Sequence, residues 1–168
     1  SEEVYEKYLT KEQTEMEKLQ SVTIDSVQPH EQQPEVDHLF KTQNSQSGYL
    51  NLVHKGWRDS RGDGFFSYEM AVEPEKEMYL HVTYFGGDRV LHLDGKAYIR
   101  EFNILVDGTE IAKQTLNEDM SDNLFDVVYT IPFRLTAGKE KIEVKFVSGE
   151  GKIAGGVYGV RVINDKIK

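Results

Sequence analysis

The stretch REFNILVDGTEIAKQTL, residues 100–116, decides the fold class of this chain. Phe102, Ile104 and Val106 are spaced two residues apart, so they point to one face of a strand. Asp107-Gly108 then supplies the positive φ angles that a two-residue hairpin turn needs, and Ile111 follows on the returning strand. The stretch therefore predicts an antiparallel β-hairpin with one apolar face.

The same alternation recurs along the chain after residue 21, between turns rich in Gly, Asp and Pro. The clearest examples are FFSYEMAV (65–72), MYLHVTYF (78–85), FDVVYTI (125–131) and KIEVKFV (141–147). The predicted strands lie near residues 22–27, 48–54, 64–72, 78–86, 98–106, 109–116, 124–131, 140–147 and 156–163. This spacing predicts an all-β, jelly-roll-like β-sandwich of the galactose-binding or carbohydrate-module kind, with a short N-terminal helix.

Composition excludes several classes of function. The chain has 168 residues, enough for one domain with a sizeable core, and it has no Cys. Disulfides, thiolate metal sites and a Cys nucleophile are therefore excluded. A net charge of -9 and a pI near 5.1 argue against nucleic acid or an anionic membrane as a partner. No apolar run approaches the roughly 20 residues of a membrane span, and no secretory segment opens the chain.

The first 20 residues differ in composition from the rest. Apolar residues recur there at roughly helical spacing among Glu and Lys: Val4, Tyr8, Leu9, Met16 and Leu19. We expect residues 1–20 to form a connector helix and residues 21–168 to form a β-sandwich accessory domain. Since no initiator Met opens the chain, we expect it to be a piece of a longer polypeptide. A helix that binds a partner is the alternative for residues 1–20.

Four stretches carry a resemblance to a known family: DSVQPHEQQPEVDH (25–38), WRDSRGDGFFSYEM (57–70), FNILVDGTEIAKQTL (102–116) and GKIAGGVYGVRV (151–162). Together they resemble the C-terminal β-sandwich of bacterial glycoside hydrolase family 127-type proteins, which include the β-L-arabinofuranosidases. Residues 89–99 look like an insertion. The resemblance implies that catalysis belongs to an upstream α-helical barrel, with a metal held by Cys and Glu and a Cys nucleophile. Because this chain has no Cys, we assign it no catalytic residue and expect no enzyme activity from it alone.

The Gln-rich stretch from residue 28 to 46 contains the first candidate site. Glu35, Asp37 and His38 lie within four residues, and carboxylates beside an imidazole can act as acid, base or metal ligand. In a strand, Glu35 and Asp37 would share one face. The favoured interpretation is structural, with these groups satisfying a long loop packed across the sandwich. A sugar or ion contact is the alternative. No second motif nominates the partner that a glycosidase acid pair needs.

The second candidate site is WRDSRGDGFFSY, residues 57–68, which mixes aromatic rings with Arg and Asp as carbohydrate sites do. Alternation assigns Phe66 and Tyr68 to the core. Trp57, the only Trp, is expected in a loop before the strand, where it would be exposed. Its neighbours Arg58 and Asp59 would then bind sugar hydroxyls, together with Glu35 and His38 from the first candidate site. The competing interpretation is an Arg58–Asp59 salt bridge with Trp57 packed under its own loop.

Calcium is a further alternative, since several Asp residues lie near glycines: Asp59, Asp63, Asp88 and Asp94. The two Arg of RDSRGDG would oppose a cation, however, so we expect no metal and no cofactor. The glycines of GKIAGGVYG are followed by no Lys-Ser/Thr and open a strand. Gly155 and Gly156 are therefore expected to allow a bulge or a close backbone crossing.

These observations predict a non-catalytic accessory domain of a bacterial glycoside hydrolase, which supports the catalytic barrel or its dimerisation. The expected partners are the upstream catalytic domain of the same polypeptide and an oligosaccharide, with neither nucleic acid nor a membrane. The parent protein is expected to be periplasmic or secreted. The alternative is an independent carbohydrate-binding module. Sandwiches host many unrelated functions, so the pattern predicts architecture better than chemistry.

Overall fold

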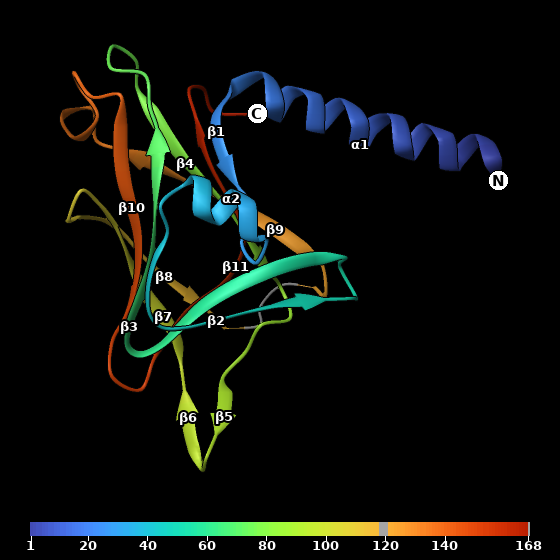
Figure 1. The fold of residues 1–168 in the computed structure, drawn as a ribbon. Helices are drawn as coiled ribbons and strands as arrows, with labels where there is room; N and C mark the ends of the chain where they lie inside the picture. Colours follow the sequence, from blue (N-terminus) through green and yellow to red (C-terminus); the bar gives the residue numbers. More distant parts are fainter. Residues whose placement is uncertain (118–120, 168) are drawn as a thin grey trace.

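The computed structural model describes residues 1–117 and 121–167. The strands form an antiparallel β-sandwich, and an N-terminal helix leaves it as an arm (Figure 1). The predicted sandwich with an N-terminal helix is confirmed. In the described part of the chain, no helix combines the length and apolar character that crossing a membrane requires. The elements are α1 (Glu2–Val22), β1 (Thr23–Val27), α2 (Gln32–Asp37), β2 (Lys41–Leu50), β3 (Lys55–Ala71), β4 (Met78–Phe85), β5 (Leu91–Leu93), β6 (Lys96–Tyr98), β7 (Arg100–Val106), β8 (Thr109–Leu116), β9 (Leu124–Ile131), η1 (Phe133–Leu135), β10 (Lys141–Ser148) and β11 (Ile153–Ile163).

The long strand β3 belongs to both walls of the sandwich. Along one edge it pairs with β2. Along the other edge its first half pairs with β11, and its second half pairs with β10, where Phe66 lies opposite Phe146. One wall therefore runs β8-β7-β10-β3 and the other β3-β11-β4-β9, with β1 paired to β11.

The core lies between these walls and consists of the inward residues of the alternating strands. The rings of Phe66 and Phe146 stack with centroids 4.9 Å apart. Phe66 and Tyr68 are fully buried, as predicted. The Asp107-Gly108 turn is also confirmed, with φ of 47° and 82° at its two residues. The largest fully buried side chains are Tyr68, Tyr84, Phe66, Phe146, Met70, Met78, Leu80, Ile104, Ile131, Ile142, Ile153 and Ile163.

The prediction was wrong for much of residues 28–63. The structure has the short helix α2 there, followed by the ten-residue strand β2, which begins at Lys41 rather than near residue 48. Strand β3 begins at Lys55 rather than near residue 64. These segments carry polar side chains on both faces, so they lack the apolar alternation that marks the other strands. The β5-β6 hairpin was also not predicted.

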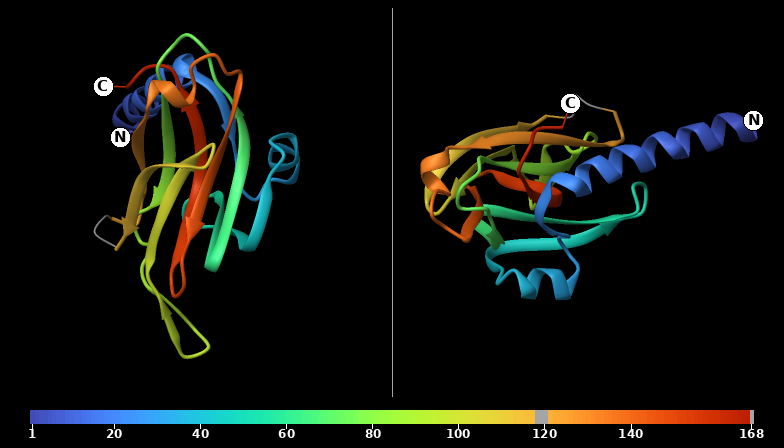
Figure 2. Two further views of the ribbon diagram at one scale, coloured as in Figure 1. Left: turned by 90° about the vertical axis from the view of Figure 1, so that its left-hand side faces the viewer. Right: turned by 90° about the horizontal axis from the view of Figure 1, so that it is seen from above.

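Helix α1 is held to the sandwich only near its C-terminal end. None of its residues is buried, and Figure 2 shows most of the helix projecting away from the strands. At that end Thr23 Oγ1, just beyond the helix, accepts a hydrogen bond from Arg161 of β11 at 3.1 Å. Tyr5 and Tyr8 are exposed on the projecting part. The role of this helix as a connector stays a prediction.

Candidate functional site

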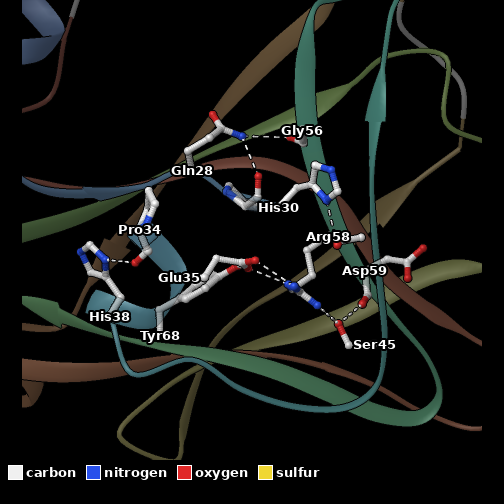
Figure 3. Close-up of polar contacts among 12 residues, drawn as sticks. Gln28, His30, Pro34, Glu35, His38, Ser45, Gly56, Arg58, Asp59 and Tyr68 are labelled. Atoms are coloured by element: carbon white, nitrogen blue, oxygen red, sulfur yellow. Dashed lines mark hydrogen bonds and ion pairs between the residues drawn. The ribbon is translucent and has the colours of Figure 1, made fainter. Parts of the chain in front are cut away.

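Strand β3 separates the predicted site residues onto two faces. Trp57, Arg58 and Asp59 are consecutive residues of this strand, so their side chains alternate between opposite sides. Figure 3 shows the Arg58 guanidinium directed at Glu35 and the Asp59 carboxylate directed away from it. The expectation that Trp57 lies in a loop was wrong. The Arg58–Asp59 salt bridge was wrong as well, because a strand keeps neighbouring side chains apart.

One face of β3 holds a closed ionic network, formed by Glu35, Ser45, Arg58 and Tyr68 and called here the Glu35 network (Figure 3). Arg58 donates from Nε and Nη2 to the two Glu35 oxygens at 2.6 and 2.8 Å, and the Tyr68 hydroxyl donates to Glu35 at 2.6 Å. Arg58 Nη1 donates to Ser45 Oγ at 2.8 Å. Glu35 is only 2% exposed. The network therefore fastens α2 and β2 to β3 and leaves no Glu35 oxygen for a sugar.

His38 lies at the C-terminal end of α2 and takes part in a separate contact. Its Nε2 lies 2.8 Å from Asp25 Oδ1 and its Nδ1 lies 2.6 Å from the Pro34 carbonyl. Burial lowers the pKa of His38, but the hydrogen bonds to Asp25 and Pro34 outweigh it, so the net pKa is raised. The strand interpretation of Glu35 and Asp37 was wrong, because the helix turns Asp37 toward solvent while Glu35 faces the sandwich.

The other face of β3 brings together Trp57, Asp59, Asp88, Arg100 and Gly156, called here the Trp57 face. Trp57 is half-buried, and its ring covers Gly48 of β2, where an added Cβ would lie 2.7 Å from the ring. Gly156 lies beside Asp88 and Trp57. A Cβ built on Gly156 would lie 3.4 Å from Asp88 Oδ2 and 3.6 Å from Trp57 Cβ. Gly48 therefore lets the β2 backbone approach the Trp57 ring closely, whereas a Cβ at Gly156 would make only ordinary van der Waals contacts.

The predicted bulge at Gly155 and Gly156 is what shapes this face. The β11–β3 register shifts between Ala154 and Val157, which confirms the bulge. Gly155 has a φ of 106°, and a Cβ there would lie 2.8 Å from the Arg58 carbonyl. A side chain at Gly155 would therefore clash with the β3 backbone.

Two buried carboxylate oxygens on the Trp57 face have no hydrogen-bond partner within the described residues: Asp59 Oδ1 and Asp88 Oδ2. The other Asp59 oxygen lies 3.3 Å from Arg61 Nη2, and the other Asp88 oxygen lies 3.8 Å from Arg100 Nη2. Burial raises the pKa of both carboxyls by more than the nearby donors lower it. Buried acceptors without donors are costly, so a ligand that presents hydroxyl groups would be favoured here.

Arg100 ties the Trp57 face together and was missed by the sequence analysis. It is 9% exposed and donates to the carbonyls of Arg89 and Gly155 at 2.7 and 2.9 Å. A signal for it was present in the sequence. Arg100 has the same parity as Phe102 and Ile104 on β7, so alternation directs its charge inward. Asp88 was considered only as a calcium ligand.

The arrangement of the Trp57 face suits a hydroxylated ligand better than a cation. Across residues 1–117 and 121–167, no three His, Asp or Glu side chains gather as a metal site would require. The guanidinium groups of Arg61 and Arg100 already lie beside the two carboxylates. Asp94 lies in the turn of the β5-β6 hairpin.

Comparison with known proteins gives a family and a fold. Residues 18–163 match a protein family described as "Family of unknown function (DUF6805)". No curated protein matches the chain in sequence.

Three solved structures illustrate the similarity in fold. A family 35 carbohydrate-binding module from Clostridium thermocellum has a TM-score of 0.58 and 11% identity, with 84% of this chain and 99% of that chain covered. The CBM36-1 domain of a multidomain xylanase from the hindgut metagenome of Trinervitermes trinervoides has a TM-score of 0.52, 10% identity and coverages of 85% and 98%. An exo-β-1,3-galactanase from Phanerochaete chrysosporium has a TM-score of 0.55 and 11% identity, and 82% of this chain matches 29% of that enzyme. The chain thus has the fold of carbohydrate-binding modules.

Proposed function

Because the chain belongs to the DUF6805 family and has a carbohydrate-binding-module fold, we propose that it is a non-catalytic accessory domain of a glycoside hydrolase that binds sugar at the Trp57 face. The observation that carries the proposal is the pair of buried, unpartnered oxygens of Asp59 and Asp88 beside the only Trp. Sugar hydroxyls donate hydrogen bonds, and an aromatic ring packs against the C–H face of a sugar.

The attachment to an enzyme is supported by two independent likenesses. The chain resembles the C-terminal sandwich of glycoside hydrolase family 127-type proteins in four stretches of sequence. In the galactanase, the matched fold makes up 29% of a longer enzyme chain. We propose on this basis that the parent polypeptide is a glycoside hydrolase and acts in the periplasm or outside the cell.

Titration calorimetry with arabinose- and galactose-containing oligosaccharides tests the binding site. A shallow site of this kind should give a dissociation constant of about 0.1–1 mM. Binding should also change the fluorescence of Trp57. The Trp57→Ala variant should lose the calorimetric signal, whereas Tyr5→Ala, which removes an exposed aromatic ring of α1, should keep it. Calorimetric binding retained in Trp57→Ala would show that the sugar does not bind at the Trp57 face.

A second candidate function is docking onto the catalytic domain, and it is favoured by helix α1. This helix has no buried residue and exposes Tyr5, Tyr8, Leu9 and Met16. An apolar helix face of this kind gains free energy when a partner covers it. Absence of heat with every neutral glycan at millimolar concentration would favour docking as the main role.

A further inference from the structure

A second pocket lies on the outer side of the β1-β11-β4-β9 wall, and Lys55 of β3, two residues before Trp57, contributes to its lining. Its volume is about 240 Å³, below the roughly 300–1,000 Å³ of pockets that hold drug-sized ligands, so it suits one small ligand. The end of α1 contributes Met16 and Leu19 to its rim. The remaining lining comes from five strands and from Gln28, which follows β1, and it includes Lys55, His81, Thr83, Asp126 and Arg161.

His81 is the polar group that marks this pocket as more than a surface hollow. Its position on β4 is outward, between the inward residues Leu80 and Val82, yet His81 is only 5% exposed. Its Nε2 lies 3.5 Å from Asp126 Oδ2, and its Nδ1 is buried without a hydrogen-bond partner among the described residues. With the Nε2 proton directed at a carboxylate, Nδ1 of a neutral imidazole is an acceptor for a hydroxyl donor.

Asp126 is already committed to its protein partners. Thr83 Oγ1 donates to Asp126 Oδ1 at 2.7 Å. Burial alone would raise the pKa of Asp126. The hydrogen bonds from His81 and Thr83 and the charge of Lys55 lower this pKa by more than burial raises it, so the net pKa is lowered. Asp126 therefore stays ionised and orients the imidazole.

Two cations in the pocket lack a carboxylate partner. Within the described part of the chain, no Asp or Glu oxygen lies within 4.0 Å of the Lys55 ammonium or the Arg161 guanidinium. Arg161 donates to Thr23 Oγ1 instead, and burial lowers the pKa of Arg161. Two cations face one carboxylate, which gives the pocket a positive balance in a chain of net charge -9.

We propose that this pocket is a second ligand site, which takes one acidic sugar unit. Lys55 and Arg161 would bind the carboxylate of a uronic acid, and His81 Nδ1 would accept a hydrogen bond from one of its hydroxyls. The proposal concerns a pocket with different lining residues and a ligand of different charge from the Trp57 face, and it does not depend on binding there.

Calorimetry with glucuronate and galacturonate, against glucose and galactose as neutral controls, tests the proposal at low salt. The uronates should bind at least about tenfold more tightly than the neutral sugars, and salt should weaken their binding because the contact is ionic. The Lys55→Met variant should lose at least about fivefold in uronate affinity. Lys41→Met, which removes an exposed lysine at the start of β2, should match the wild type.

A spectroscopic measurement on the wild-type protein covers the case in which the pocket variants do not fold. Uronate titration followed by NMR should shift the ring nitrogens of His81 more than those of the other four His residues. Equal affinity for uronates and neutral sugars, no binding in the millimolar range, or shifts centred on other His residues would overturn the proposal. Uronate binding that is lost in Trp57→Ala and kept in Lys55→Met would place the ligand on the Trp57 face instead.

Discussion

Asp88 is a buried residue that costs the fold free energy when its carboxylate is ionised, and the proposed sugar site would account for this cost. Burial and the nearby Asp59 carboxylate raise the pKa of Asp88 by more than Arg100 and the Gly156 N–H lower it. Between the usual carboxyl pKa and the raised pKa, Asp88 keeps its proton in the folded protein but has lost it in the unfolded chain. Stability therefore falls as the pH rises through this range. A group that destabilises the fold when ionised is typical of a binding site rather than of a structural ion pair.

The Asp88→Asn variant tests this trade-off. It should be more stable than the wild type at neutral pH, and its stability should fall less with rising pH in the acid range, because an amide does not ionise. Its sugar affinity should fall at least about fivefold, since a carboxylate accepts hydroxyls more strongly than an amide. Urea denaturation at several pH values and calorimetry measure the two effects. Lower stability together with unchanged affinity would show that Asp88 has a structural role.

His38 has the opposite pH dependence. Since its pKa is raised in the folded protein by Asp25 and Pro34, its contribution to stability is fully present below the usual His pKa and is lost as the pH rises through the folded value. The urea midpoint of the wild type should therefore fall as the pH rises above the usual His pKa of about 6.5. His38→Gln should flatten this step, while His54→Gln, at the exposed β2–β3 turn, should leave it in place. A step of the same size in His38→Gln would contradict the assignment.

At the scale of the element, the geometry of strand β3 explains why the predicted site residues do not form one site. Only some of them lie together, and Arg58 lies on the opposite face of the strand from Trp57 and Asp59. Trp57, Arg58 and Asp59 were grouped by their nearness in sequence. A strand sends consecutive side chains to opposite faces, so Arg58 joins Glu35 in a closed network while Trp57 and Asp59 join Asp88 and Arg100. The observed grouping could be predicted only if the polar stretch before residue 64 were recognised as a strand. The side chains of that stretch carry no apolar alternation, so the sequence does not mark it as one.

Helix α1 should be dispensable for folding, because none of its residues is buried. A protein that lacks residues 1–18 should unfold cooperatively, with a free energy of unfolding within about 1 kcal/mol of the full chain. Its far-UV circular dichroism should lose most of the helical signal and remain dominated by β-structure. Loss of cooperative folding would mean that the contact of the α1 end with β1 and β11 belongs to the core.

At the scale of the whole molecule, the sequence predicted the strands that form the walls of the sandwich and missed helix α2 and most of strand β2. Strands such as β4 and β10 bury one face in the core, so their apolar alternation is visible in the sequence alone. Helix α2 and strand β2 are held instead by polar contacts such as Arg58 to Glu35, which come from residues 23 positions apart. Contacts of that kind leave no local periodicity, and neither does the meeting of Asp59 with Asp88 and Arg100.

Because β3 belongs to both walls, the two walls should unfold together. Phe146 is fully buried and stacks on Phe66 of β3, so Phe146→Ala should cost about 3–5 kcal/mol through lost burial and the cavity left behind. Val128→Ala, at a more exposed position on β9, should cost less than about 1 kcal/mol. In urea, circular dichroism should report the whole sheet and Trp57 fluorescence should report the first half of β3. The two transitions should coincide in the wild type and move together in Phe146→Ala. An earlier fluorescence transition would show that the β2–β3 ribbon with the Trp57 face unfolds separately from the core.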